Sequence, residues 1–133
     1  MNPNFMPAGW LLRVPFAAVF LFHGAGKLAM PAASAQMLEL PMALVLLVGL
    51  AELLAGLGAL VGGWPRLAKA DLVTRLAGLA AAPVLLGGIA MVHWPRWSFT
   101  PSESHPMGGM EFQVVLLGMA VYFMLTGARE RAH

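Results

Sequence analysis

The sequence predicts an all-α membrane protein, a single domain in which four transmembrane helices form a bundle. Its composition is one reason: 59% of the 133 residues are hydrophobic and only 11% are charged, whereas soluble domains carry about 25% charged residues. The pattern is another reason, because long apolar runs alternate with short stretches rich in charge, Pro and Gly. With a mean hydropathy of +0.76, a soluble fold of this length could not bury its apolar surface.

The first apolar run predicts a helix over residues 8–30, which is long enough to cross a bilayer. Near its far end His23 and Lys27 stand four residues apart, so they share one face of the helix. Ionisable side chains are expensive inside hydrocarbon, and their presence in a span therefore indicates a function. The next stretch, residues 31–40, is Ala-rich with a single charge and is interpreted as a loop.

The second helix is predicted over residues 41–62, with Pro41 in its first turn and Glu52 as its single charge. At about 1.5 Å per residue, Glu52 lies roughly 16 Å from the start of this helix and therefore near the bilayer midplane. A carboxylate at this depth must be protonated, paired or hydrogen-bonded. Two interpretations stay open: Glu52 holds two helices together, or it binds a ligand group or relays a proton.

Two further helices are predicted over residues 72–92 and 110–127, and the polar stretch between them contains His105. His93 directly follows the third helix, and Glu111 stands at the start of the fourth. Consecutive spans run in opposite directions, so His93 and Glu111 are expected at the same end of the bundle. The fourth apolar stretch is shorter than the roughly 20 residues that usually cross a bilayer.

The distribution of positive charge predicts the orientation. Six Lys or Arg residues fall on the side of the two chain ends and two fall on the other side, so the positive-inside rule places both ends in the cytoplasm. The six are Arg13, Arg66, Lys69, Arg75, Arg129 and Arg131, and the two are Lys27 and Arg96. We expect a multi-pass protein of the bacterial inner (plasma) membrane. No basic tract accompanies the net charge of +2, so the lipid bilayer is an expected partner and nucleic acid is not.

The polar side chains within the spans define a candidate site, a pocket in the outer half of the bundle with Glu52 as its floor. Its candidate catalytic residues are Glu52, His23 and Lys27, and its candidate cofactor-binding residues are His23, His93 and Glu111. Simpler interpretations stay open for two of them. Lys27 can extend its ammonium group to the membrane interface, and Glu111 can be a carboxylate favoured by a helix N-terminus.

His23 and His93 can each hydrogen-bond a quinone carbonyl or a Glu side chain, and these residues alone do not decide between the two partners. His23 and His93 could instead ligate a haem iron from two helices, but nothing in the sequence favours this, and haem is not expected. No pair of ligands has the tight spacing of a zinc or copper site, so no metal site is predicted. The sequence has no Cys, which excludes thiol redox chemistry and Cys-ligated clusters in this chain.

Each apolar run carries short motifs, and their order along the chain is informative. They are Leu11-Leu12-Arg13, Phe22-His23-Gly24-Ala25-Gly26-Lys27-Leu28, Val48-Gly49-Leu50-Ala51-Glu52-Leu53-Leu54-Ala55-Gly56, Val92-His93-Trp94-Pro95, Gly108-Gly109-Met110-Glu111-Phe112 and Thr126-Gly127. Together they resemble the DoxX family, with DoxD, of small four-helix membrane proteins, from about Leu11 to Gly127. The sequence departs from the family at Arg96-Trp97-Ser98-Phe99, where members often have Asn-Gly-Phe.

The resemblance implies a membrane-embedded component of a redox system, because members are associated with thiosulfate:quinone oxidoreduction and with oxidative-stress complexes. The first hypothesis is therefore a subunit of a quinone-linked redox assembly that is not catalytic by itself. His23 or His93 would hydrogen-bond a quinone carbonyl, and Lys27 would stabilise developing negative charge. Glu52 and Glu111 would handle protons.

A second hypothesis is a non-catalytic accessory subunit packed on a larger respiratory or photosynthetic membrane complex. The polar residues would then hold the bundle together, and an ion pair between Glu52 and Lys27 would favour this interpretation. A small transporter is a third hypothesis, but too few polar residues lie below Glu52 to line a continuous path.

Overall fold

The structure is a computed structural model that describes residues 8–64 and 66–128. The described residues form helices joined by turns and loops, which confirms the predicted all-α class. The helices are α1 (Ala8–Ala29), α2 (Pro31–Leu38), α3 (Met42–Val61), α4 (Ala70–Gly88) and α5 (Glu111–Thr126), and α4 continues into the π-helical turn η1 (Ile89–His93).

Three of these helices, α1, α3 and the continuous α4–η1 helix, are long and apolar enough to cross a membrane. The fourth apolar helix, α5, has only 16 residues. Each of the four helices begins and ends within two residues of its predicted boundary. The runs were predictable because hydropathy and length together specify a spanning helix.

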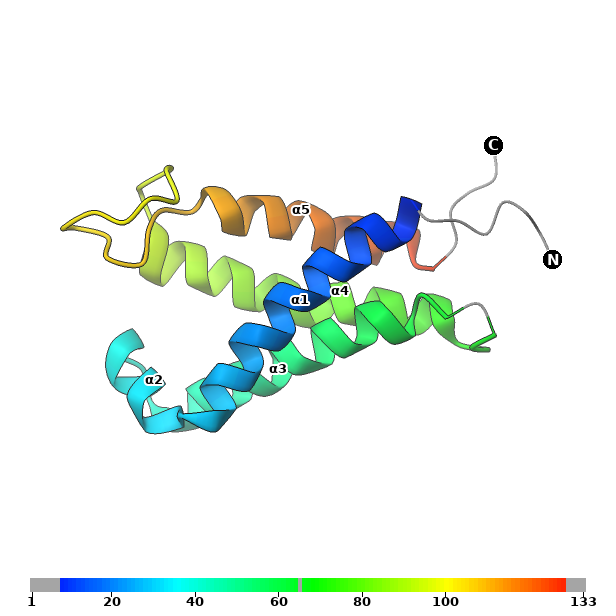
Figure 1. Cartoon of the computed structure of the whole chain (residues 1–133), viewed down its shortest axis with the longest axis horizontal. Coiled ribbons are helices and arrows are strands. Elements are labelled where there is room, and N and C mark those ends of the chain that lie inside the picture. The colour runs from blue at the N-terminus through cyan, green and yellow to red at the C-terminus, as the bar shows by residue number, and fades with distance from the viewer. Residues whose placement is uncertain (1–7, 65, 129–133) are drawn as a thin grey trace.

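The predicted loop over residues 31–40 is wrong, because its first eight residues form α2. Pro31 occupies the first helical position, where the missing N–H has no helical partner to lose. Three Ala residues follow within the next four positions, and Ala has the highest helix propensity. The helix stops at Glu39, which adopts a left-handed conformation with φ of 54°. The short helix lies beside the start of α3 with none of its residues buried (Figure 1).

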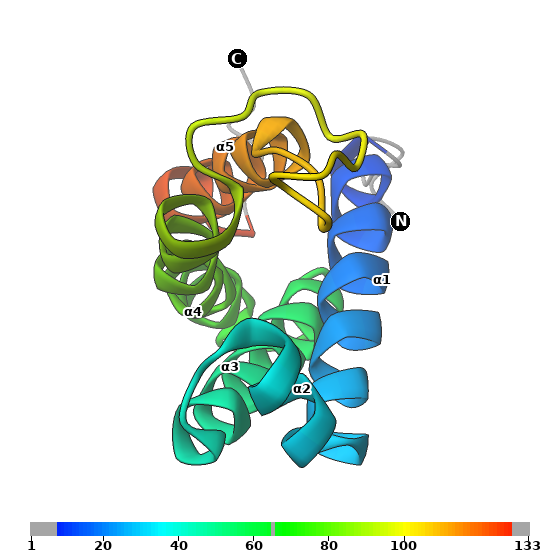
Figure 2. The same cartoon turned by 90° about the vertical axis from the view of Figure 1, so that its left-hand side faces the viewer.

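The long helices are arranged around the bundle in the order α1, α3, α4, α5, as the view along the bundle shows (Figure 2). Each packs against the next in this order. Helix α1 runs diagonally, so that its start lies near the end of α5 and its end lies beside the start of α3 (Figure 1). The start of α1 and the end of α5 therefore lie at one end of the molecule.

The core is built from a few aromatic rings and many small side chains. Phe16 and Phe123 are almost fully buried and meet edge-on, with 5.1 Å between their ring centroids. The other buried members of this core are Phe20, Ala55, Ala59, Ala77, Ala81, Leu85, Leu116 and Ala120. Most large aliphatic side chains instead point outward, as expected where lipid covers the surface, and small residues bring the helices together.

Candidate functional site

The candidate site contains a direct ion pair between α1 and α3. Lys27 lies in the last turn of α1, and its Nζ donates to Oε1 and Oε2 of Glu52, in the middle of α3, at 2.9 Å each. The two side chains are 16% and 7% exposed. Both carboxylate oxygens therefore engage the ammonium group, and each charge is neutralised at its buried position.

Glycines make this close approach of α1 and α3 geometrically feasible. A Cβ atom on Gly24 would lie 2.8 Å from the carbonyl oxygen of Gly49 and 3.0 Å from the Cβ atom of Glu52. A Cβ atom on Gly49 would lie 3.1 Å from the Cβ atom of Lys27. Any larger side chain at either position would separate the backbones that carry the ion pair.

His23 lies one turn before Lys27 on α1, and its side chain is exposed on the surface of the described bundle. Its ring meets the ring of Phe22 edge-on, with 5.5 Å between the centroids. No hydrogen bond within the described residues joins His23 to the Lys27–Glu52 pair. His23 therefore lies one helical turn from the Lys27–Glu52 pair, and its side chain faces the surface that lipid would cover.

His93, at the end of η1, forms a second polar pair with Gln113 on α5. Its Nδ1 lies 2.8 Å from the carbonyl oxygen of Gly108, and a carbonyl can only accept, so Nδ1 carries the proton. The other ring nitrogen, Nε2, then accepts from the Gln113 side-chain N–H at 2.8 Å. This arrangement leaves Gln113 Oε1 as a buried oxygen without a hydrogen-bond partner in the described part of the chain.

Glu111 is the first residue of α5, and its side chain contacts the loop that precedes the helix. Its Oε2 accepts a hydrogen bond from the backbone N–H of Phe99 at 3.2 Å. Its own N–H donates to the carbonyl of Trp97 at 2.9 Å. In the same loop, the His105 ring bonds the carbonyl of Trp94 at 3.0 Å. The contacts of Glu111 match its simpler interpretation, a carboxylate at a helix N-terminus.

The five predicted site residues therefore fall into separate groups. Lys27 and Glu52 are brought together, whereas His93 bonds Gly108 and Gln113, and Glu111 bonds the loop. Among the residues that the structure describes, no hydrogen bond or ion pair joins these groups. The same residues contain no group of three His, Cys, Asp or Glu side chains placed to hold a metal ion.

A buried arginine, which had served only as one of the positive charges that predict the orientation, lies at the other end of the bundle. Arg13 on α1 is 5% exposed, and its Nη1 donates to the carbonyl of Ala59 at 2.6 Å and to Thr74 Oγ1 at 3.1 Å. Its guanidinium carbon lies 5.2 Å from the ring centroid of Phe123. The Arg13 side chain thus contacts α3, α4 and α5. Its position inside an apolar run was the sequence signal that could have identified Arg13 as a buried charge.

A second arginine at this end holds the end of α5. Arg75 on α4 forms an i, i+4 ion pair with Asp71 at 2.9 Å. Its Nη1 also donates to the carbonyls of Met124 and Leu125 at 2.6 and 3.0 Å. These carbonyls belong to the last turn of α5, where a cation satisfies acceptors that have no helical partner.

The apolar helices and the charges buried between them define a multi-pass helical membrane protein. The DoxX family model matches residues 9–94, which is more than half of the chain, and the protein belongs to the DoxX family. This confirms the resemblance over α1, α3 and α4, whereas the motifs proposed for α5 lie beyond the matched region. No curated protein and no solved structure matches the chain.

Proposed function

We propose that this DoxX protein is a non-catalytic accessory subunit packed on a larger respiratory or photosynthetic membrane complex. The observation that supports this role is the two-oxygen contact between Lys27 and Glu52, the pair expected of a subunit whose charges hold its helices together. His93 is likewise engaged through both ring nitrogens. Their hydrogen bonds join neighbouring helices, so the polar groups favour a structural role over proton transfer.

We further propose that the protein crosses the inner membrane of a bacterium four times, with both chain ends in the cytoplasm. The charged residues Arg66, Lys69 and Arg75 lie at the end of the bundle where α1 starts and α5 ends. This distribution supports the orientation by the positive-inside rule. Two further residues that entered the prediction, Arg129 and Arg131, lie outside the described residues.

A test separates a structural ion pair from a functional one. The double variant Lys27→Met with Glu52→Leu removes both charges and replaces them with apolar side chains of similar volume. The single variant Glu52→Leu leaves the Lys27 cation without its partner. A structural pair tolerates the double replacement, because apolar substitution of a buried ion pair is often neutral. We expect the double variant to insert, to co-purify with its partner proteins from native membranes in gentle detergent, and to support turnover by that complex at the wild-type rate.

Loss of turnover in a double variant that still co-purifies would contradict the structural role and make the pair part of the chemistry. Failure of the wild-type protein to co-purify with any respiratory or photosynthetic complex would contradict the accessory role itself. The single variant Glu52→Leu is the matched control, because it shows what an unpaired Lys27 does to assembly.

A second candidate function is quinone binding at the α1–α3 surface, which one observation favours. His23 is exposed on α1 one turn before Lys27, and the Lys27 side chain retains 16% exposure. A quinone that enters laterally from lipid could accept a hydrogen bond from either residue. Glu52→Gln then abolishes quinone-linked turnover without affecting insertion, and extraction yields stoichiometric quinone from the wild-type protein only. Full turnover in Glu52→Gln would exclude this site.

A further inference from the structure

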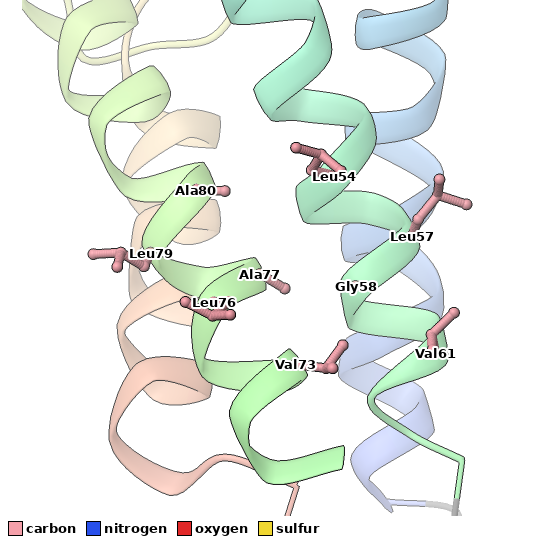
Figure 3. Close-up of a pocket in the computed structure, with 9 residues that line it drawn as sticks. All are labelled: Leu54, Leu57, Gly58, Val61, Val73, Leu76, Ala77, Leu79 and Ala80. Atoms are coloured by element: carbon pink, nitrogen blue, oxygen red, sulfur yellow. The ribbon is translucent and has the colours of Figure 1, made fainter. Parts of the chain in front are cut away.

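An apolar groove of about 550 Å³ runs along the surface between α3 and α4 (Figure 3). Its lining is entirely apolar: Leu54, Leu57, Gly58, Val61, Val73, Leu76, Ala77, Leu79 and Ala80. The four Leu side chains are 50–56% exposed, so the groove opens to the surroundings of the bundle. It lies away from the Lys27–Glu52 pair, which joins α3 to α1.

The shape of the groove follows from the size of its residues. Gly58 and Ala77 form the floor, because a Cβ atom on Gly58 would lie 2.9 Å from the Cβ atom of Ala77. Small residues let two helices approach closely at this point. The larger Leu side chains on both helices then flank a shallow channel, and Ala77, Val73 and Ala80 project from α4 toward α3 (Figure 3).

The groove has the dimensions of part of one acyl chain. On α3 it extends from Leu54 to Val61, and on α4 from Val73 to Ala80, a length of about 10 Å along each helix. One leaflet of the hydrocarbon core is about 15 Å thick. The groove therefore lies within a single leaflet, and its end at Val61 and Val73 adjoins the turn that connects the two helices.

That turn carries two cations and no acidic residue. Arg66 and Lys69 are both exposed, and residues 62–70 contain no Asp or Glu. Lys69 stands four residues before Val73 on the α4 side of the turn, and its carbonyl accepts the Val73 N–H at 3.0 Å. The exposed Trp64 precedes both cations, and Trp is enriched where a membrane meets water.

The first acidic residue after the turn forms its described ion pair within α4. Asp71 is paired with Arg75, with 2.9 Å between Oδ2 and Nε. The apolar groove thus ends beside two exposed cations for which the described part of the chain shows no acidic partner. A neutral lipid would fill the groove without matching the charges of Arg66 and Lys69.

We propose that the α3–α4 groove binds one acyl chain of an anionic phospholipid, whose headgroup lies against Arg66 and Lys69. The groove buries the chain, and the two cations provide the headgroup preference. Each Lys or Arg near an anionic membrane surface contributes about a fivefold preference. This site is independent of the accessory role proposed above, because its test measures lipid binding alone.

The test measures lipid retained by the full-length protein in detergent, by native mass spectrometry, in equimolar phosphatidylglycerol and phosphatidylcholine of identical acyl chains. We expect the wild-type protein to retain phosphatidylglycerol preferentially. The exposed pair Arg66→Gln with Lys69→Gln lowers that preference by up to about 25-fold, from the contribution of two cations. The matched control Arg96→Gln removes a cation at the opposite end of the bundle and leaves the preference unchanged.

A second variant tests the groove itself. Ala80→Leu fills the end of the groove that is remote from the cations, and it lowers retention of both lipids several-fold. Ala18→Leu, on an exposed face of α1, adds the same side chain elsewhere and leaves retention unchanged. Equal retention of both lipids by the wild-type protein would overturn the proposal. Unchanged lipid retention in Ala80→Leu, or an unchanged lipid preference in Arg66→Gln with Lys69→Gln, would also overturn it. So would displacement of phosphatidylglycerol by a neutral quinone or by a second copy of the protein.

Discussion

The two ends of the bundle distribute their buried polar groups differently. At the end where α1 starts, the single side chain of Arg13 hydrogen-bonds α3 and α4 and lies over the ring of Phe123 on α5. At the other end, Lys27 and Glu52 join only α1 to α3. His93 and its partner there join only the end of the α4 helix to α5 and its preceding loop.

This difference indicates two kinds of stabilisation. The Arg13 end connects helices across the bundle, because one cation contacts three neighbours of α1. At the opposite end the polar contacts between described residues stay within adjacent helix pairs, so we infer that apolar packing holds the pairs together. We therefore expect the Arg13 end to determine whether the bundle forms, and the Lys27 end to determine how closely α1 lies against α3.

The largest effect is expected from Arg13→Met. The substitution removes two hydrogen bonds and the contact with the Phe123 ring, and it leaves the buried Thr74 hydroxyl without this donor. Breaking a buried polar network of this kind costs about 3–5 kcal/mol. Denaturant titration in detergent micelles, followed by circular dichroism, measures the loss. Arg13→Lys retains the charge and should lose less, and wild-type stability in Arg13→Met would show that Arg13 does not anchor the bundle.

The next effect concerns the ion pair at the other end. Glu52→Leu leaves the Lys27 ammonium group without its carboxylate, and we expect the free energy of unfolding to fall by about 2–4 kcal/mol. This loss is smaller than for a fully buried pair, because Lys27 can still extend toward the interface. The double variant with Lys27→Met recovers to within about 1 kcal/mol of the wild type. A double-mutant cycle in the same titration measures the coupling. Additive losses would mean that the two charges do not stabilise each other.

A smaller effect tests how closely α1 approaches α3. Gly24→Ala places a Cβ atom against the backbone of α3, and overpacking of this kind costs about 1–3 kcal/mol. Gly26→Ala is the matched control on the same helix, since its added Cβ atom meets no atom within 4 Å. The control should be neutral or up to about 1 kcal/mol stabilising, because Ala favours helix over Gly. Equal stability of the two variants would contradict the close approach.

The smallest effect is expected from His23→Ala. The ring is exposed and contacts only Phe22 among the interactions described for it, so stability should change by less than about 0.5 kcal/mol. A loss of bound quinone in this stably folded variant would support the second candidate function. A large loss of stability would instead show that His23 has a structural role.

The four long helices were predictable because their length and hydropathy are local properties of the sequence. Helix α2 was missed because an eight-residue helix leaves no such signal, and its Ala-rich composition was interpreted as a loop. The ion pair was predictable only in part. Depth indicated that Glu52 needs a partner, and Lys27 was one candidate, but one sequence does not reveal which helices are adjacent.

The polar partners at the ends of the bundle were harder to predict. Gln113 is neutral and carries no charge signal, although its side chain hydrogen-bonds the His93 ring. Arg13 was visible inside an apolar run, yet it was used only as one of the positive charges that predict the orientation. Both misses have the same cause, because burial depends on the packing of helices that are distant in the sequence.

The length of α5 has a consequence for the surrounding membrane. Its 16 residues extend about 24 Å, whereas the hydrocarbon core of a typical bilayer is about 30 Å thick. If α5 crosses upright beside the longer α4–η1 helix, lipid on its side must thin locally, at a cost of a fraction of a kcal/mol per Å of mismatch. Hydrophobic mismatch would then favour a thinner bilayer for this protein, or a partner that covers α5.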